Sequence, residues 1–134
     1  MAIRNRKTPL PPEAKGIVGT VRLARRAKDL AALREGDIAI VDHPDLDSQQ
    51  AEALIDRRVR AVLNTSPSSS GRIPNVGPQM LAHAGITLVD VAGSDLAAAL
   101  KPGDKVRIED GKVYKDEILV VAGTPLDQRR TASD

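Results

Sequence analysis

The chain has 134 residues, a length that fits one domain with a substantial core. It contains no Phe, no Trp, no Cys and one tyrosine, Tyr114, which excludes disulfides and thiolate chemistry and disfavours stacking on nucleic-acid bases. The 20 basic and 18 acidic residues are interleaved, so the net charge of +2 gives little support for a nucleic-acid partner.

The start of the chain, residues 1–14, is predicted to be a flexible basic arm outside the core. It combines a basic run with residues 9–12 (PLPP), which suit neither a helix nor a central strand. We expect this arm to be solvated and not to bind nucleic acid or membrane. No segment reaches the ~20 apolar residues of a membrane span and no apolar leader is found, so a cytoplasmic location is expected.

The first half of the sequence predicts alternating strands and helices. Residues 16–23 and 59–63 are rich in strand formers, and the apolar run 38–41 is typical of a strand buried on both faces. Helix formers fill 27–33, and Asp47 can cap a helix that runs to residue 57. The order of strand, helix and strand from 38 to 63 indicates a right-handed βαβ unit with parallel strands.

The second half completes a domain predicted to span residues 15–123. A helix over 78–84 closed by Gly85, a strand over 86–91 and a helix capped by Ser94 are expected. The pair Asp110-Gly111 predicts a hairpin between strands 105–109 and 112–115, and 118–122 is a last strand. Residues 124–134 are expected to be a tail or the start of a linker helix. The fold class is therefore α/β, with a mixed sheet, short helices and a C-terminal β-hairpin.

The long polar segment 64–77 has the composition of an anion-binding loop. Its hydroxyls, backbone amides, glycines and one guanidinium could hold a phosphate or carboxylate. Contact with a protein partner and a purely structural loop are the alternatives. It is not a P-loop, because no Gly-Lys-Ser/Thr follows at the required spacing. The candidate ligand-binding residues are Asn64, Ser66, Ser68, Ser69, Ser70, Gly71, Arg72, Asn75 and Gly77.

Secondary candidates follow the predicted strand 38–41. Asp42, His43 and Asp45 stand where α/β proteins often place ligands. A turn at Asp45 and a helix cap at Asp47 explain these residues locally, and this interpretation is favoured over metal ligation. No Gly-x-Ser-x-Gly nucleophile elbow occurs, and we expect no catalytic residue, metal or cofactor in this chain.

Five motifs together resemble the SteA family of cytokinetic ring proteins. They are 36–43 (GDIAIVDH), 45–54 (DLDxxxAEAL), 59–64 (VxAVxN), 70–78 (SGRxPNxGP) and 84–86 (AGI). The resemblance covers about residues 16–123, and Ile73 and Val76 stand where the family more often has Tyr and Leu. It implies a non-catalytic module of a bacterial cell-division protein that binds a ligand or a partner from the division machinery.

The resemblance also implies alternatives. Family members usually continue into a domain resembling thiamin pyrophosphokinase and a membrane-anchoring segment, so this chain could be the accessory domain of a nucleotide-binding enzyme and reach the septum through regions not present here. The order of elements resembles the swivelling β/β/α domain of phosphoenolpyruvate-utilising enzymes. Their phosphate-carrying histidine has no counterpart in 75–77 (NVG), so that relay is not implied. Self-association into a homo-oligomer stays open.

Overall fold

The computed structural model describes residues 16–66, 68, 76–91 and 96–126, which form a mixed α/β fold. The strands are β1 (Ile17–Leu23), β2 (Ile38–Val41), β3 (Ala61–Asn64), β4 (Thr87–Asp90), β5 (Lys105–Glu109), β6 (Lys112–Lys115), β7 (Ile118–Ala122) and β8 (Thr124–Leu126). The helices are α1 (Ala27–Ala31), α2 (Ser48–Asp56), α3 (Gly77–His83) and α4 (Leu96–Ala99). None of the helices in these ranges is long and apolar enough to cross a membrane.

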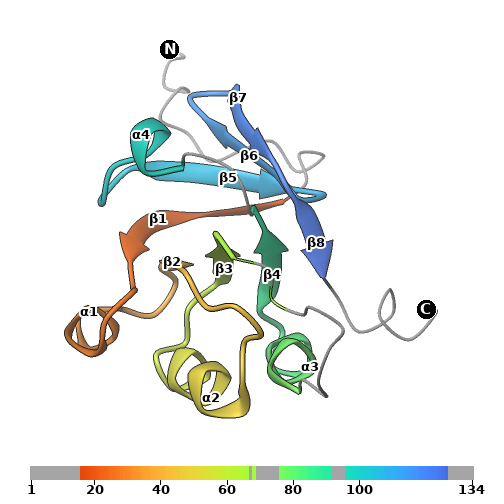
Figure 1. The fold of residues 1–134 in the computed structure, drawn as a ribbon. Helices are drawn as coiled ribbons and strands as arrows, with labels where there is room; N and C mark the ends of the chain where they lie inside the picture. The colour runs from red at the N-terminus through yellow and green to blue at the C-terminus, as the bar shows by residue number, and fades with distance from the viewer. Residues whose placement is uncertain (1–15, 67, 69–75, 92–95, 127–134) are drawn as a thin grey trace.

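The described strands form one mixed sheet in the order β7-β6-β5-β1-β2-β3-β4-β8. Strands β1 to β4 are parallel to one another, and β5 to β8 pair antiparallel. The predicted parallel βαβ unit is thus confirmed in β2, α2 and β3. Helices α1, α2 and α3 all lie on one side of the parallel strands, whereas β5, β6, β7 and α4 lie on the other (Figure 1). The carboxyl ends of β2, β3 and β4 therefore meet at one edge, which we call the carboxyl edge.

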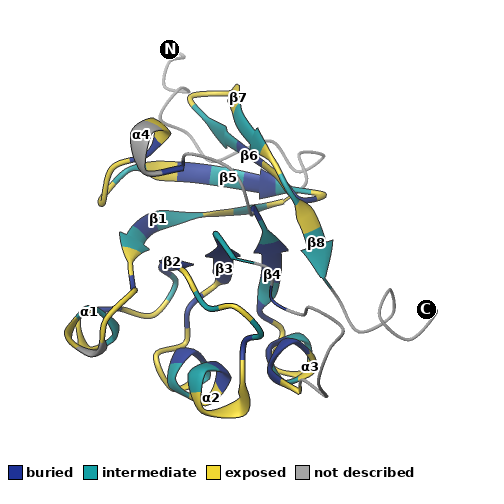
Figure 2. Ribbon diagram, in the orientation of Figure 1, coloured by how far each residue is buried: buried dark blue, intermediate teal, exposed yellow. Residues whose placement is uncertain are grey.

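Side chains from the two faces of the parallel strands pack into two separate hydrophobic cores. In β2, Ile38 and Ile40 belong to the core shared with β5, β6 and α4, while Ala39 and Val41 belong to the core beneath the helices. Figure 2 shows β2 and β3 in the buried colour, as expected for the apolar run 38–41. Because strand side chains alternate, the same period places Asn64 and Asp90 on the helix-facing side.

The sheet closes on itself where β7 continues into β8. These strands lie at opposite ends of the sheet order, yet only Gly123 separates them in the chain. The Gly123 amide donates to the carbonyl oxygen of Gly111 at 2.8 Å, and a Cβ on Gly123 would lie 2.6 Å from the carbonyl oxygen of Asp90. β8 then pairs with β4 and covers what would otherwise be an exposed strand edge. Closure thus depends on close backbone contact at Gly123.

Local sequence signals predicted several element ends correctly. Asp47 caps α2, its Oδ1 accepting the Gln50 amide at 2.8 Å. Gly85 follows α3 with φ +81°, and the turn between β5 and β6 has φ +51° at Asp110 and +82° at Gly111. Both turn residues are left-handed, as in the tight hairpin turns that favour Asp-Gly. The predicted cap Ser94 lies outside the described residues.

The last strand lies outside the predicted domain 15–123. Thr124–Leu126 form strand β8, where the sequence suggested a tail or the start of a helix, so the sheet extends three residues past the predicted domain end at 123. The segment is short and contains Pro125, which lacks an amide donor and is tolerated only on an edge strand. Its strand conformation comes from pairing with β4, a partner more than thirty residues away in sequence that no local pattern reveals.

Closure of the sheet predicts a stability defect in Gly123→Ala. The added methyl would meet the Asp90 carbonyl oxygen at 2.6 Å and Cγ1 of Val89 at 2.7 Å, so β8 must move away from β4. We expect the free energy of unfolding, measured in urea, to fall by about 1–3 kcal/mol. The neighbouring exposed Ala122→Ser should change it by less than about 0.5 kcal/mol. Equal stability of the two variants would contradict the proposed role of the contact.

Candidate functional site

The buried side chain of Asn64, the last residue of β3, organises the carboxyl edge. Its amide nitrogen donates to the His43 carbonyl at 3.0 Å and to the Ser68 hydroxyl at 2.8 Å. Its oxygen accepts the His43 amide at 3.0 Å and the Ser66 amide at 3.1 Å. Every hydrogen-bonding position of the Asn64 amide is therefore used. The side chain ties the residue after β2 to the loop after β3.

Ser68 extends this network to β4. It is fully buried, and both its amide and its hydroxyl donate to the carboxylate of Asp90, at 3.0 Å and 2.5 Å. Its carbonyl accepts the Leu46 amide at 3.0 Å. Ser68 thus contacts β4 through Asp90, β3 through Asn64 and the loop after β2 through Leu46. We name Asn64, Ser68 and Asp90 the edge network.

Asp90 is not among the residues predicted for the site. The residue lies in the predicted strand 86–91 (ITLVDV), where its neighbours are apolar. A carboxylate in a half-buried strand is uncommon and needs a partner, so its position was a usable signal. The identity of that partner could not be predicted from the sequence, because Ser68 precedes Asp90 by 22 residues.

Asp42 and His43, both secondary candidates, lie next to the network. The Ser66 hydroxyl donates to the Asp42 carboxylate, and this hydrogen bond lowers the pKa of Asp42. His43 is partly buried, and its burial lowers the pKa of the imidazole against the opposing charges of Asp47 and Asp42. Asp45 adopts φ +52°, in agreement with the turn role considered for it. The structure therefore brings Asn64, Ser66, Ser68, Asp42 and His43 together.

Gly77 anchors the far end of the polar segment. A Cβ at this position would lie 2.2 Å from the carbonyl oxygen of Leu46 and 2.9 Å from that of Asp47. Gly77, predicted as a ligand-binding residue, packs in the structure against the backbone of the loop that leads into α2. Ser68 and Gly77 both contact this loop, one through a hydrogen bond and one through packing. The remaining candidates Ser69, Ser70, Gly71, Arg72 and Asn75 lie outside the described residues.

The described groups at this edge can orient polar atoms, but they do not form a nucleophile–base pair of the Ser–His type. The hydroxyls of Ser66 and Ser68 donate to carboxylates. No group of three or more His, Asp or Glu residues that could hold a metal ion occurs in the described ranges. Burial also raises the pKa of Asp90, although its two hydrogen bonds from Ser68 act in the opposite direction. The described groups therefore offer hydrogen bonding at a preorganised carboxyl edge.

A separate hollow lies at the other end of the parallel strands. Its volume is about 560 Å³, and it is lined by the residues that follow α2 and α3 and by the turn before β2. It therefore lies at the amino ends of β2, β3 and β4, away from the edge network. Comparison with known protein families and with curated proteins finds no match to this chain.

Removal of the Asn64 amide should destabilise the fold. Asn64→Ala leaves the amide of Ser66, the hydroxyl of Ser68 and both backbone groups of His43 without their present partner. We expect a loss of roughly 2–4 kcal/mol in the free energy of unfolding, because part-buried polar groups become unsatisfied. Chemical denaturation measures this, with the exposed Gln79→Ala as control. A loss no larger than that of the control would show that the network is not structural.

The raised pKa of Asp90 predicts a pH-dependent stability contribution with a defined sign. A carboxyl whose folded pKa is above its unfolded value stabilises the fold when protonated, and this contribution is lost as pH rises from the usual aspartate pKa of 3.8 through the folded pKa. The stability of the wild type minus that of Asp90→Asn should therefore fall over this interval. Urea unfolding at several pH values measures the difference, in which other acids such as Asp42 cancel. A difference that rises with pH would contradict the assignment.

Proposed function

We propose that this chain is a non-catalytic binding module of a SteA-like bacterial cell-division protein, and that it binds an anionic group at its carboxyl edge. The observation that carries the proposal is the double anchoring of the polar segment. The edge network holds its first residues, and the contact of Gly77 with Leu46 holds its end. Residues 69–75, which include Arg72, connect these two anchors.

The free-energy cost of burying the polar side chains that anchor the segment supports a binding role. Ser68 and Asn64 are buried polar side chains, and burying such groups is unfavourable unless each finds partners. A plain connection between β3 and α3 does not require them. A segment that must present hydroxyls, amides and a guanidinium in a fixed arrangement does, since preorganisation lowers the entropy lost on binding.

The two carboxylates at the carboxyl edge make the positive charge of Arg72 necessary for the proposed anion site. Asp42 and Asp90 are two carboxylates at the same edge, and each would repel a bound anion when ionised. Arg72 is the residue of segment 64–77 that can offset them, because it is the only cation in that stretch of sequence. A guanidinium also binds phosphate or carboxylate through two parallel hydrogen bonds. The proposed ligand is therefore a small phosphate- or carboxylate-bearing molecule or an acidic segment of a division protein.

The alternative role is that of an accessory domain beside a thiamin pyrophosphokinase-like enzyme. The closed mixed sheet with α1, α2 and α3 on one side and α4 on the other supports the swivelling-type architecture that this role would use. In that case the carboxyl edge would complete a nucleotide site on a neighbouring domain. The two roles differ in whether this chain binds an anion by itself.

Arg72→Ala should abolish ligand-induced stabilisation. We expect at least one compound from a panel of nucleotides and phosphorylated metabolites to raise the melting temperature of the wild type, because a ligand that binds only the folded state stabilises it. The variant should show no such rise, whereas the exposed control Arg34→Ala should respond as the wild type does. The measurement is a thermal-shift titration. Identical responses of the wild type and Arg72→Ala would exclude the anion site, and stabilisation seen only with the neighbouring domain present would favour the accessory role.

A further inference from the structure

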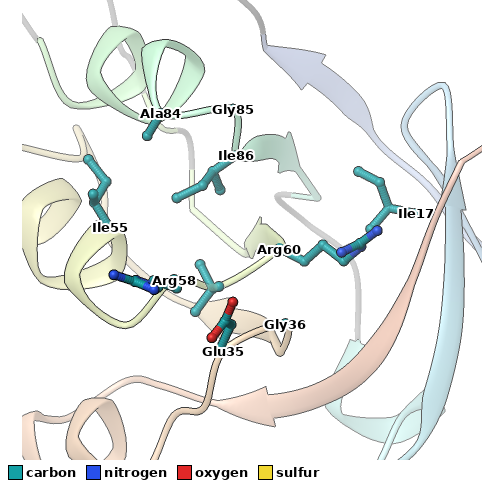
Figure 3. A pocket seen from close by; sticks show the side chains of 10 residues that line it. Ile17, Glu35, Gly36, Ile55, Arg58, Arg60, Ala84, Gly85 and Ile86 are labelled. Atoms are coloured by element: carbon teal, nitrogen blue, oxygen red, sulfur yellow. The ribbon is translucent and has the colours of Figure 1, made fainter.

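The hollow at the amino ends of the parallel strands is lined by three isoleucines and by two arginines. Ile86 is 7% exposed, and Ile17 and Ile55 are half-buried around it. Arg58 and Arg60 line the same hollow together with Glu35. In the view of Figure 3, the Arg58 guanidinium lies on the side of Ile55 and the Arg60 guanidinium on the side of Ile17, with the Glu35 carboxylate between them.

The two arginines carry no ion pair within the described ranges. The ion pairs found there join other residues: Arg22 with Asp37, Arg107 with two glutamates, and Lys115 with Asp104. Two guanidinium groups and one carboxylate give the hollow a net charge of +1 from the charged residues that line it. Its volume of about 560 Å³ is within the roughly 300–1,000 Å³ of small-molecule sites.

The left-handed backbone conformation of Arg58 indicates that this position requires an arginine side chain. Arg58 follows the last turn of α2 with φ +56°, the left-handed position where helices usually place glycine. Helix α3 ends at the same hollow in the same way, and there the residue is Gly85 with φ +81°. An arginine therefore occupies a position at which glycine would cost less.

Other described residues with positive φ have explanations that do not apply to Arg58. Three of the five non-glycine cases are Asp45, Asp110 and Asp116, and aspartate tolerates this conformation. The fourth, Glu117, forms an ion pair with Arg107 at 3.0 Å. The carbonyls of Leu54 and Ile55 at the end of α2 already accept backbone amides, so they do not need the Arg58 guanidinium.

We propose that this hollow binds an amphipathic anion, a carboxylate or phosphate joined to an apolar body. The apolar body contacts Ile17, Ile55 and Ile86, and Arg58 and Arg60 attract the anionic head. Glu35 opposes the head and so limits affinity. This site is independent of the proposed carboxyl-edge site, since it lies at the opposite ends of the same strands.

The first test compares the head groups of one aliphatic chain. Octanoate and octyl phosphate should bind the wild-type chain, and octanol and octylammonium should bind more weakly, in titrations followed by amide chemical shifts. The shifts should centre on Gly85 and Ile86. Comparison of octanoate with octyl phosphate shows which anionic head is preferred. Octanol binding as tight as octanoate, or shifts elsewhere on the chain, would overturn the proposal.

Removal of a positive charge and removal of the negative charge should change the affinity for octanoate in opposite directions. Arg58→Gln and Arg60→Gln should weaken octanoate binding by roughly two- to fivefold each, and Glu35→Gln should strengthen it by a similar factor, as expected for exposed charges. A weaker affinity in at least one arginine variant, together with a tighter one in Glu35→Gln, supports the site. Unchanged affinity in both arginine variants would refute it.

Arg58→Gly separates a binding role from a structural one. Glycine removes the strain of the left-handed position, so the variant should melt about 3 °C higher than the wild type while it binds octanoate more weakly. The matched variant Arg57→Gly, one residue earlier where φ is −85°, should melt lower and keep its affinity. A lower melting temperature for Arg58→Gly would show that Arg58 is retained for stability, against the proposal.

Discussion

The four hydrogen bonds of the buried Asn64 side chain are the constraint on which the carboxyl edge depends. The backbone hydrogen bonds between parallel strands end where the strands end, so they do not join the loops that follow. Asn64 continues the connection beyond that point, since it bonds the backbone of His43 after β2 and the loop after β3. Its own backbone carbonyl accepts the Val91 amide at 2.8 Å, next to β4. One residue therefore links three successive strands.

Burial explains why the polar side chains of the edge network need hydrogen-bond partners. β2 and β3 are covered by helices on one side and by the antiparallel strands on the other, and Asn64 and Ser68 at the carboxyl edge are fully buried. In such an environment a hydrogen bond is stronger and an unsatisfied polar group more costly than at an open surface. The close contact at Gly123 places β8 against the edge of β4, the strand that carries Asp90.

Local chemistry made much of the fold predictable. The apolar run 38–41, the Asp47 cap and the Asp110-Gly111 turn each act over a few residues, and the structure has all of them. β8 could not be recognised, because its conformation comes from pairing with β4 and not from its own residues. The candidate site was predictable to the same extent. Asn64, Ser66 and Ser68 stood out as a polar segment after a strand, whereas Asp90 joins them only through the register of β3 and β4.

The two ends of the parallel strands differ in how their charges are satisfied. At the carboxyl edge, Asp42 and Asp90 accept hydrogen bonds from the serines of the loop, so their charge is committed to holding that loop. At the amino ends, Arg58, Arg60 and Glu35 line a hollow together with Ile17, Ile55 and Ile86, and none of the three charged residues takes part in the ion pairs of the described ranges. Internal hydrogen bonds rigidify a surface, whereas charges without partners remain able to gain from a ligand. The same three strands, β2, β3 and β4, thus end in an internally hydrogen-bonded edge on one side and, on the other, in charged residues without ion pairs in the part of the chain that the structure describes.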